Sequence, residues 1–439
     1  MLHRLKKFVP KPLVNFYHYC LVIFANFWYR HPSGKLILIG VTGTAGKTTT
    51  CYLIAKILEG AGYKVGCISS AVLKVNQKEW LNDKMITMPG RLALQKLLSQ
   101  MVKANCQYAV VETTSEGIKQ FRHIGLNYDS LLFTNLYPEH LKAHGNFENY
   151  KKTKLKIFKQ ISKQKLKFLA GRKVPKKIIV NLDDINAKDF LDCQADKKFG
   201  FTIKNKVANE IETIYPDQFN INDQGLSFSI QGVSFSSNLL GQHNFYNLLA
   251  AIATANCQGI ELDKIAKILS QNLVIPGRLE LIDEGQNFKV IVDCAFDQAQ
   301  MSELYRVVGG LNKNRIIHVI GGGGRFQELW HELGEVVGNK SDIVIVTNVD
   351  PFGRDPEFIA KQIFQAVEST GKISDQNLFK ILDRTQAIQK AIQLANFNDL
   401  ILITGKGGEQ KLMIESHRGI PWDDRLVVRE NLINFRDRG

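Results

Sequence analysis

The sequence predicts an α/β fold that is divided into two consecutive domains. Short apolar runs that are typical of buried strands alternate with helical segments from residue 34 to residue 274. Pro276-Gly277-Arg278 interrupts this pattern, which restarts at Phe288 and continues toward the C-terminus. Such alternation predicts mostly parallel sheets with helices on both faces. The second domain is expected to be a Rossmann-like α/β domain.

The first expected strand, at residues 37–42, leads into a glycine-rich loop and then a helix over residues 48–58. Backbone N–H groups at a helix start, together with the helix dipole, form a cradle for phosphate. Lys47 is expected to reach the terminal phosphates of a nucleotide, and the Thr48 hydroxyl to bind Mg²⁺. The residues expected to form this P-loop are Gly43, Thr44, Ala45, Gly46, Lys47, Thr48 and Thr49. The alternative is a glycine-rich turn before an ordinary helix, because Val41 stands where a standard P-loop has its first glycine.

The composition limits the classes of partner. The 439 residues carry a formal net charge of +15, but the lysines are spread along the chain and form no arginine-rich arm. This distribution disfavours nucleic acid and leaves anionic substrates or an anionic membrane surface as explanations. The seven cysteines are scattered without C-x-x-C pairs, which argues against disulfides or zinc and for a reducing cytoplasm.

Residues 1–33 differ from the rest of the chain. A basic stretch is followed by residues 13–29, which are nearly all apolar or aromatic. No small-residue cleavage site follows, which disfavours a signal peptide, and the run is short and contains Asn15, His18 and Asn26, which disfavours a membrane-spanning helix. We expect an amphipathic helix that lies on the inner membrane face or packs on the next domain.

The remaining elements follow from local patterns. Further strands of the first domain are expected at residues 64–69, 109–113, 130–135 and 178–181. Residues 197–240 have shorter runs and turn signals, which predict a small antiparallel appendage, and a helix is expected at residues 244–255. Strands of the second domain are expected at residues 290–292, 316–320, 343–347 and 400–404. The predicted divisions are residues 1–33, 34–274 and 275–439.

Two places after the P-loop carry metal-binding residue types. Glu112 ends an apolar strand, which is where sites form in open α/β sheets. His140 and His144 are four residues apart, so a helix would present both on one face. Two surface histidines are the alternative, because the sequence offers no third ligand beside them.

The P-loop spacing and the segment from Phe133 resemble the Mur ligase family. That segment reads F-T-N-L-Y-P-E-H-L-K-A-H-G-N-F-E-N-Y-K-K-T-K and matches the signature F-T-N-L-x-x-D-H-L-D-x-H-G-x-x-x-x-Y-x-x-x-K. The resemblance implies that Glu112 and His140 bind metal and that Lys154 reacts with CO₂ to form a carbamate. A carbamate would turn a lysine, whose free pKa is about 10.4, into an anionic metal ligand. A basic solvated helix face is the alternative for Lys154.

The resemblance extends to residue 430 and is closest to the branch called MurE. It implies that Asn244 lies near the adenine, that Arg278 binds phosphate and that Asp293 binds ribose. G-K-G-G-E at residues 405–409 and P-W-D-D-R at residues 421–425 resemble segments of that branch. The implied substrate-binding residues are Thr87, Ser115, Asp350, Arg354, Gly405 and Glu409.

The implied activity is that of an ATP-dependent amide ligase of peptidoglycan precursor synthesis in the cytoplasm. Its ligands would be ATP, two Mg²⁺ ions, an amino acid and a muramoyl-peptide that carries UDP or a lipid. The alternatives are a folylpolyglutamate-type glutamyl acceptor and a nucleotide-binding module without ligase activity. Residues 1–33 stand in place of the usual UDP-binding domain, so recognition of UDP stays open.

One departure from the family bears on the amino acid. The motif D-N-P-R reads V-D-P-F at residues 349–352, so Phe352 stands where an arginine would pair with the distal carboxylate of diaminopimelate. Diaminopimelate is therefore not expected to be preferred, and Glu409 would favour lysine, ornithine or a smaller amino acid. Arg354 is the residue that would restore the contact.

Overall fold

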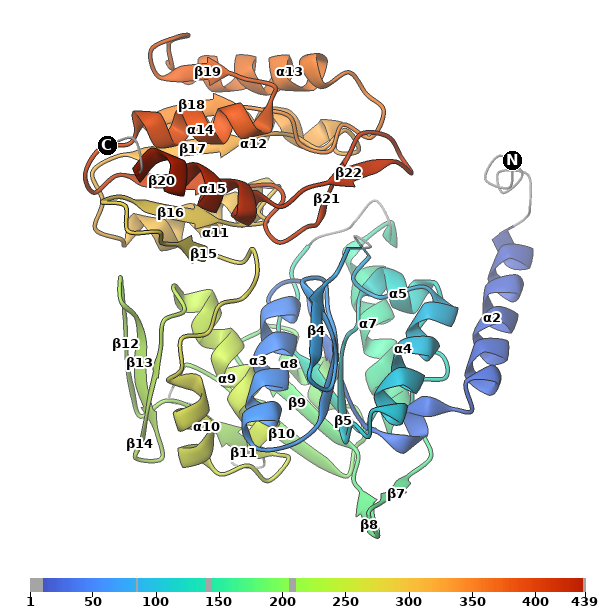
Figure 1. Cartoon of the computed structure of the whole chain (residues 1–439). Helices are drawn as coiled ribbons and strands as arrows, with labels where there is room; N and C mark the ends of the chain where they lie inside the picture. The colour runs from blue at the N-terminus through green and yellow to red at the C-terminus, as the bar shows by residue number, and fades with distance from the viewer. Residues whose placement is uncertain (1–10, 84–85, 139–143, 205–210, 437–439) are drawn as a thin grey trace. The chain divides into compact units, whose positions relative to one another are not determined.

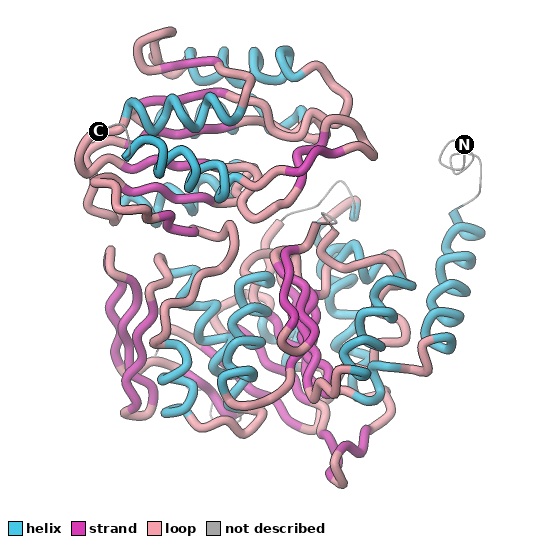
Figure 2. The backbone as a smooth tube through the Cα atoms, viewed as in Figure 1, coloured by secondary structure: helices cyan, strands magenta, loops and turns pink. Residues whose placement is uncertain are grey.

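The computed structural model describes residues 11–83, 86–138, 144–204 and 211–436. Two compact units are present: the first comprises Met1–Asn220, Leu226–Asn238 and Gln242–Leu273, and the second comprises Ile221–Gly225, Leu239–Gly241 and Val274–Gly439. Each contains a main sheet with helices packed against it (Figures 1 and 2). The predicted α/β class is therefore confirmed.

The main sheet of the first unit has nine strands in its described part, in the order β11-β10-β9-β6-β1-β5-β2-β3-β4. Its strands are β1 (Ile37–Thr42), β2 (Val65–Ile68), β3 (Val72–Val75), β4 (Lys78–Leu81), β5 (Tyr108–Glu112), β6 (Ser130–Phe133), β9 (Lys177–Asn181), β10 (Lys197–Phe201) and β11 (Glu212–Ile214). Pairing is parallel from β11 through β2 and antiparallel at β2–β3 and β3–β4. This places β1 at the centre, with the carboxyl ends of β5 and β6 on either side of the P-loop.

Helices cover both faces of this sheet. On one side α3 (Lys47–Gly60) packs against α9 (Gln242–Asn256) and α10 (Leu262–Leu269). On the other side α4 (Arg91–Lys103), α7 (Phe147–Ile161) and α8 (Ala187–Leu191) supply side chains to one apolar cluster. Alternation along β1 explains the division, because Leu38 belongs to that cluster while Ile39 and Val41 point to the α3 side. The sheet is thus buried on both faces, as a parallel sheet requires.

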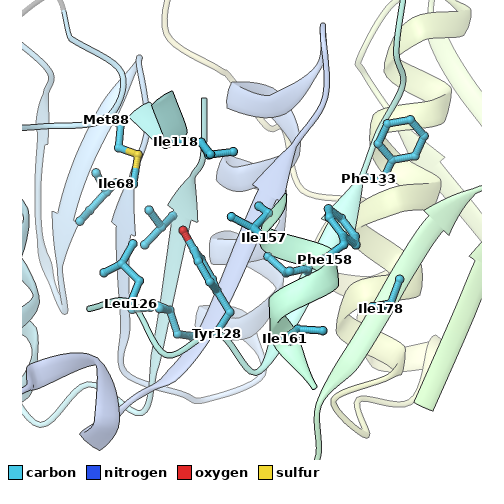
Figure 3. Close-up of a cluster of buried hydrophobic side chains, with 14 of the residues drawn as sticks. Ile68, Met88, Ile118, Leu126, Tyr128, Phe133, Ile157, Phe158, Ile161 and Ile178 are labelled. Atoms are coloured by element: carbon cyan, nitrogen blue, oxygen red, sulfur yellow. The ribbon is translucent and has the colours of Figure 1, made fainter. Parts of the chain in front are cut away.

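Figure 3 shows the centre of that cluster around Tyr128. The Tyr128 hydroxyl shares a 3.0 Å hydrogen bond with Thr113 Oγ1, which satisfies its polar atom inside the core. Gly40 makes room for the ring, since a Cβ at that position would lie 2.6 Å from Tyr128 Cε1. This glycine therefore fixes how the strand before the P-loop packs.

The predicted antiparallel appendage over residues 197–240 is only partly correct. Strands β10 and β11 extend the parallel sheet instead, through β9. The separate small sheet consists of β12 (Gln218–Asn222), β13 (Gly225–Ile230) and β14 (Val233–Ser237). The local pattern of β10 does not show that its partner lies about twenty residues earlier, at residues 177–181. The β3–β4 hairpin also escaped prediction.

The second unit has a six-stranded main sheet in the order β15-β16-β20-β17-β18-β19, in which only β15–β16 is antiparallel. Its strands are β15 (Glu280–Ile282), β16 (Lys289–Val292), β17 (Ile316–Ile320), β18 (Ile343–Val346), β19 (Leu378–Lys380) and β20 (Leu400–Ile403). One apolar cluster joins α11 (Gln298–Gly309), α12 (Trp330–Lys340) and α13 (Pro356–Glu368) to the sheet. The other joins α14 (Arg384–Leu394) and α15 (Asp424–Arg436).

Helix α2 and several short elements complete the described chain. They are α2 (Lys11–Trp28), η1 (Pro32–Lys35), α5 (Ser115–Lys119), β7 (Lys167–Leu169), β8 (Arg172–Val174), η2 (Gln327–Leu329), β21 (Lys411–Met413) and β22 (Gly419–Pro421). Helix α2 contacts α4 of the first unit. Of the helices that the structure describes, none has both the length and the hydrophobicity needed to cross a bilayer.

Candidate active site

The P-loop between β1 and α3 lies against side chains from the loop after β6 and from α9. The N–H groups of Thr44 and Ala45 donate to Asn135 Oδ1 at 3.2 and 2.8 Å. Gly46 has φ 78°, and a Cβ there would lie 2.2 Å from Asn247 Oδ1. The N–H groups of the first turn of α3 have no acceptor within the helix and can therefore bind an anion.

Two lysines point into this loop from different elements. Lys47 Nζ donates to Thr44 O at 2.7 Å, and Lys154 Nζ donates to Gly43 O at 2.6 Å. Lys154 is buried in α7, and its Nζ also lies 4.6 Å from the centre of the Tyr150 ring. The Tyr150 hydroxyl in turn shares a 3.2 Å hydrogen bond with Thr44 Oγ1. Two cationic groups therefore converge on the backbone of the expected phosphate cradle.

Glu112 meets the start of α3 at the carboxyl end of β5. The Thr48 hydroxyl donates to its two oxygens at 3.2 and 3.0 Å, and the Ser70 N–H donates to Oε2 at 2.8 Å. Ser70 Oγ also shares a 2.7 Å hydrogen bond with Thr87 Oγ1. The expected metal ligands Thr48 and Glu112 are thus adjacent, and Ser70 links them to the expected substrate residue Thr87. Sequence reasoning missed Ser70 because it follows β2 without any motif.

The structure describes His144 but not His140, which lies outside the described residues. His144 Nε2 shares a 3.2 Å hydrogen bond with Ser115 Oγ, so the expected substrate residue Ser115 is held beside His144. Among the described residues, no three His, Cys, Asp or Glu side chains gather to hold a metal ion. Hard oxygen ligands for Mg²⁺ are nevertheless present in Thr48 and Glu112, so this part of the site fits that ion.

Helix α9 carries two asparagines, Asn244 and Asn247, of which Asn244 is the residue expected near the adenine. Asn247 Nδ2 donates to Asn244 Oδ1 at 3.0 Å, and Thr50 Oγ1 donates to Asn247 Oδ1 at 3.3 Å. Asn247 is thus the member of the N-x-x-N pair that contacts the P-loop helix, while Asn244 positions it. Thr49 is buried in the same first turn of α3.

In the second unit Asp293 organises the turn that carries Arg278. Its two carboxylate oxygens accept from the N–H groups of Leu279 and Ala295, at 2.7 and 2.8 Å. Gly277 has φ 63° and lies so close to Gly408 that a Cβ would be 1.7 Å from its nitrogen. The structure therefore brings the P-G-R turn against the G-K-G-G-E segment, as two backbones in direct contact.

Lys406 of that segment is fully buried between two carboxylates. Its Nζ lies 2.7 Å from Asp350 Oδ2 and 2.6 Å from Glu409 Oε2. Asp350 Oδ1 also accepts from the Met413 N–H at 2.6 Å. Loss of solvation raises the pKa of Glu409, which Lys406 opposes. The ion network of Lys406 thus includes two residues that are expected to bind substrate, Asp350 and Glu409, and Gly405 lies next to Lys406 in the sequence.

The Arg354 side chain contacts Gln327 and Trp330. Its guanidinium donates to Gln327 Oε1 at 2.7 Å and lies 5.7 Å from the Trp330 ring centre. The guanidinium of Arg325 lies 3.9 Å from the Phe352 ring centre. Arg325 is therefore the cation at this position, and it was missed because its contact with Phe352 joins two loops far apart in sequence.

Comparison with known proteins decides the family. Residues 41–255 match the model of the Mur ligase middle domain, and residues 277–407 match that of the Mur ligase, glutamate ligase domain. The UDP-N-acetylmuramyl-tripeptide synthetase of Borreliella burgdorferi is 34% identical over 419 residues, which cover 94% of this chain and 79% of that protein. This chain belongs to the Mur ligase family. It is accordingly an ATP-dependent acid–amino-acid ligase of peptidoglycan synthesis.

Other proteins similar to this Mur ligase support the same family assignment. The UDP-N-acetylmuramoyl-L-alanyl-D-glutamate–2,6-diaminopimelate ligase of Geobacillus thermodenitrificans is 32% identical over 96% of this chain and 84% of its own length. A solved structure of an enzyme with that name aligns with a TM-score of 0.62 and 25% identity, over 92% of this chain and 79% of its own. Folylpolyglutamate synthase of Mycobacterium tuberculosis aligns with a TM-score of 0.66 at 15% identity, over 88% of this chain and 92% of its own, and shares the fold.

Proposed function

We propose that this Mur ligase joins the amine of an amino acid to the carboxylate of a muramoyl-peptide and uses ATP to activate that carboxylate. A carboxylate oxygen attacks the γ-phosphorus of ATP and ADP leaves, which gives an acyl phosphate. The amine then attacks the acyl carbon, and inorganic phosphate leaves from the tetrahedral intermediate. The observation that supports this most is the convergence of Lys47, Thr48 and Glu112 at the P-loop.

The residues of the first unit would act by holding and neutralising charge. Lys47 exchanges the Thr44 carbonyl for phosphate oxygens, and the N–H groups of the first turn of α3 bind the remaining oxygens. Thr48 and Glu112 would hold Mg²⁺, which when bound neutralises the charge that develops on the phosphates. No side chain needs to form a covalent bond, so positioning supplies most of the rate enhancement.

Lys154 would carry a carbamate as a further metal ligand. Its amine is buried and 2.6 Å from Gly43 O, beside the residues that would hold phosphate and metal. Carbamate formation from CO₂ and the neutral amine converts a cation at that place into an anion. The proposal therefore gives a buried lysine a chemical role that an ammonium group cannot have, because an ammonium would repel Mg²⁺.

The second unit would bind the amino acid and part of the nucleotide. Glu409 and Asp350 present two carboxylates to an incoming ammonium group, although Lys406 already neutralises part of their charge. Arg278 would bind a phosphate and Asp293 the ribose of ATP. Arg325 on the Phe352 ring is exposed, and it is the group that a distal carboxylate of the amino acid would meet.

The test is mass spectrometry of products after incubation with ATP, Mg²⁺, mixed amino acids and one acceptor at a time. The acceptors are UDP-muramoyl-dipeptide, its lipid-linked counterpart and a folate glutamate. We expect an ATP-dependent mass increase of one amino-acid residue on a muramoyl acceptor, with none in Lys47→Ala. Extension of the folate glutamate alone would contradict the proposal.

A further inference from the structure

Helix α2 exposes a continuous apolar face that nothing else in the described chain explains. Eight large apolar or aromatic side chains of α2 have exposed fractions between 45% and 73%. They are Leu13, Phe16, Tyr17, Tyr19, Ile23, Phe24, Phe27 and Trp28. Most of them follow the spacing i, i+3, i+4, i+7, which places them on one side of a helix. We call this set the α2 stripe.

The other side of α2 is already used for packing within the first unit. Val22 and Ala25 are buried, and the helix lies along α4 (Figure 1). Asn26 contacts the loop at Gly125, where a Cβ would lie 2.8 Å from Asn26 Cγ. Helix α2 is therefore apolar on two sides but buried on one, so the α2 stripe needs an explanation outside this unit.

Charge around the α2 stripe selects the kind of partner. No acidic residue occurs in the sequence before Glu59, and the exposed residues Arg30 and Lys35, which follow α2, are basic. Arg91 at the start of α4 interacts electrostatically with Tyr17 of the stripe and with Arg122. Arg91 Nη2 and Arg122 Nη2 donate to Gln120, at O and Oε1 respectively, and Arg122 also interacts electrostatically with Glu116. An apolar face with basic surroundings complements an anionic surface.

We propose that the α2 stripe inserts into the interface of an anionic lipid bilayer and that the basic residues around it contact the lipid head groups. Aromatic side chains are favoured at the head-group level, and an interfacial helix needs one apolar face rather than a spanning length. A second copy of this chain would cover the same apolar area. Such a dimer would also bring two sets of basic residues together without an acidic partner in α2, and this repulsion disfavours the dimer. The inference does not rest on which acceptor the ligase uses.

The experiment is co-sedimentation of the full chain with vesicles of phosphatidylcholine, with and without phosphatidylglycerol. We expect the anionic vesicles to bind at least about tenfold more tightly than the neutral ones, and less tightly as salt is added. Phe27→Asp should lower this partitioning by at least about tenfold. The matched control is Phe168→Asp in β7, because Phe168 is 74% exposed and Phe27 is 73% exposed. Equal binding of both variants, or no preference for anionic vesicles, would overturn the proposal.

Two further readouts separate insertion from other effects. Trp28 should be quenched by brominated lipids, and the quenching should disappear in Trp28→Phe. Phe27→Asp should retain the thermal midpoint of the parent, because the side chain is exposed. If the parent instead forms a dimer that Phe27→Asp dissociates, and does not bind vesicles, the stripe is an interface between copies and the proposal fails.

Discussion

The P-loop lysines contact the backbone, whereas several buried lysines elsewhere in the two units contact carboxylates, among them Lys167 and Lys176 on Asp129. In the first unit Lys47 and Lys154 donate to backbone carbonyls of the P-loop, at Thr44 and Gly43. In the second unit Lys406 is held by two carboxylates, Asp350 and Glu409. The contact with Thr44 O leaves the charge of Lys47 available to an anionic ligand, whereas the ion network cancels the charge of Lys406. The difference indicates that the first site is arranged for ligand chemistry, while the Lys406 network also maintains the structure of its own unit.

Lys47→Ala should cause the largest loss of activity with the smallest loss of stability. Loss of one charge that stabilises the transferring phosphoryl group costs about 10²–10³-fold in kcat. Steady-state phosphate release measures kcat, and thermal unfolding measures stability. Lys96→Ala on exposed α4 is the control and should match the parent. If the kcat of Lys47→Ala were close to that of the parent enzyme, the assignment of this loop as the P-loop would be wrong.

Lys154→Ala should also inactivate the enzyme, and its chemistry can be tested by rescue. If the lysine acts as a carbamate, short carboxylates added to Lys154→Ala should restore part of the phosphate release by occupying the vacated position. The same additives should not rescue Lys47→Ala, whose missing group is a cation. Lys154→Arg should be inactive, because a guanidinium does not form the carbamate; a fully active Lys154→Arg would refute the role.

Lys406→Met should lower stability more than activity, which is the opposite of what is expected for Lys47→Ala. Removal of the cation leaves Asp350 largely buried with an uncompensated charge, which costs about 3–5 kcal/mol when a buried pair is broken. Chemical denaturation followed by circular dichroism measures the loss. The double variant Asp350→Asn/Lys406→Met should recover part of it, since both charges are then gone. Unchanged stability in Lys406→Met would show that the network is not structural.

The contrast also shows what the sequence predicted and what it did not. Thr48 and Glu112 meet because the P-loop that leads to Thr48 follows β1 and Glu112 ends β5, and these strands are parallel neighbours in the sheet. Local patterns predict each of the two strands. Ser70 and Asn135 contact the same site through the loops after β2 and β6. Asn135 lies in the F-T-N-L segment, but no role was predicted for either residue. Such contacts depend on strand order, which apolar runs alone do not give.

The second unit was predicted less completely because its site depends on contacts between distant loops. Arg325 reaches Phe352 from the loop after β17, and Gly277 meets Gly408 across more than a hundred residues. The same limitation explains β10, whose parallel partner β9 cannot be read from its own composition. Motif spacing therefore located the chemistry of the P-loop better than the environment of the amino-acid residues.

The pH dependence of stability should report on the second unit through His318. Its Nδ1 lies 2.6 Å from the Tyr305 hydroxyl and its Nε2 lies 2.9 Å from Thr404 Oγ1. Burial, with a smaller contribution from Arg384, lowers the pKa of His318 to about 3 from the ordinary 6.5. Because the unfolded chain then binds the proton first, stability should fall as the pH drops from about 6.5 toward 3, by at most about 1.4 kcal/mol per pH unit.

His318→Gln should flatten that dependence, measured as the free energy of unfolding against pH. His331 is the control, because its side chain is 71% exposed and pairs only with Glu335 of the same helix. His331→Gln should leave the slope unchanged. An equal slope in His318→Gln and the parent would show that other groups control acid unfolding.

The smallest expected effect is the choice of amino acid, where the cation on the Phe352 ring is the exposed Arg325. Phe352 cannot pair with a distal carboxylate, and Arg354 is directed to Gln327 and Trp330. Arg325 lies on the Phe352 ring, but an exposed cation contributes little to binding a carboxylate, about 0–1 kcal/mol. We therefore expect lysine to be ligated at least as well as diaminopimelate in direct competition, read by product mass. Arg325→Ala should lower the diaminopimelate share up to about fivefold, whereas Arg354→Ala should leave it unchanged. Clear preference for diaminopimelate that disappears in Arg354→Ala would instead place the carboxylate contact at Arg354.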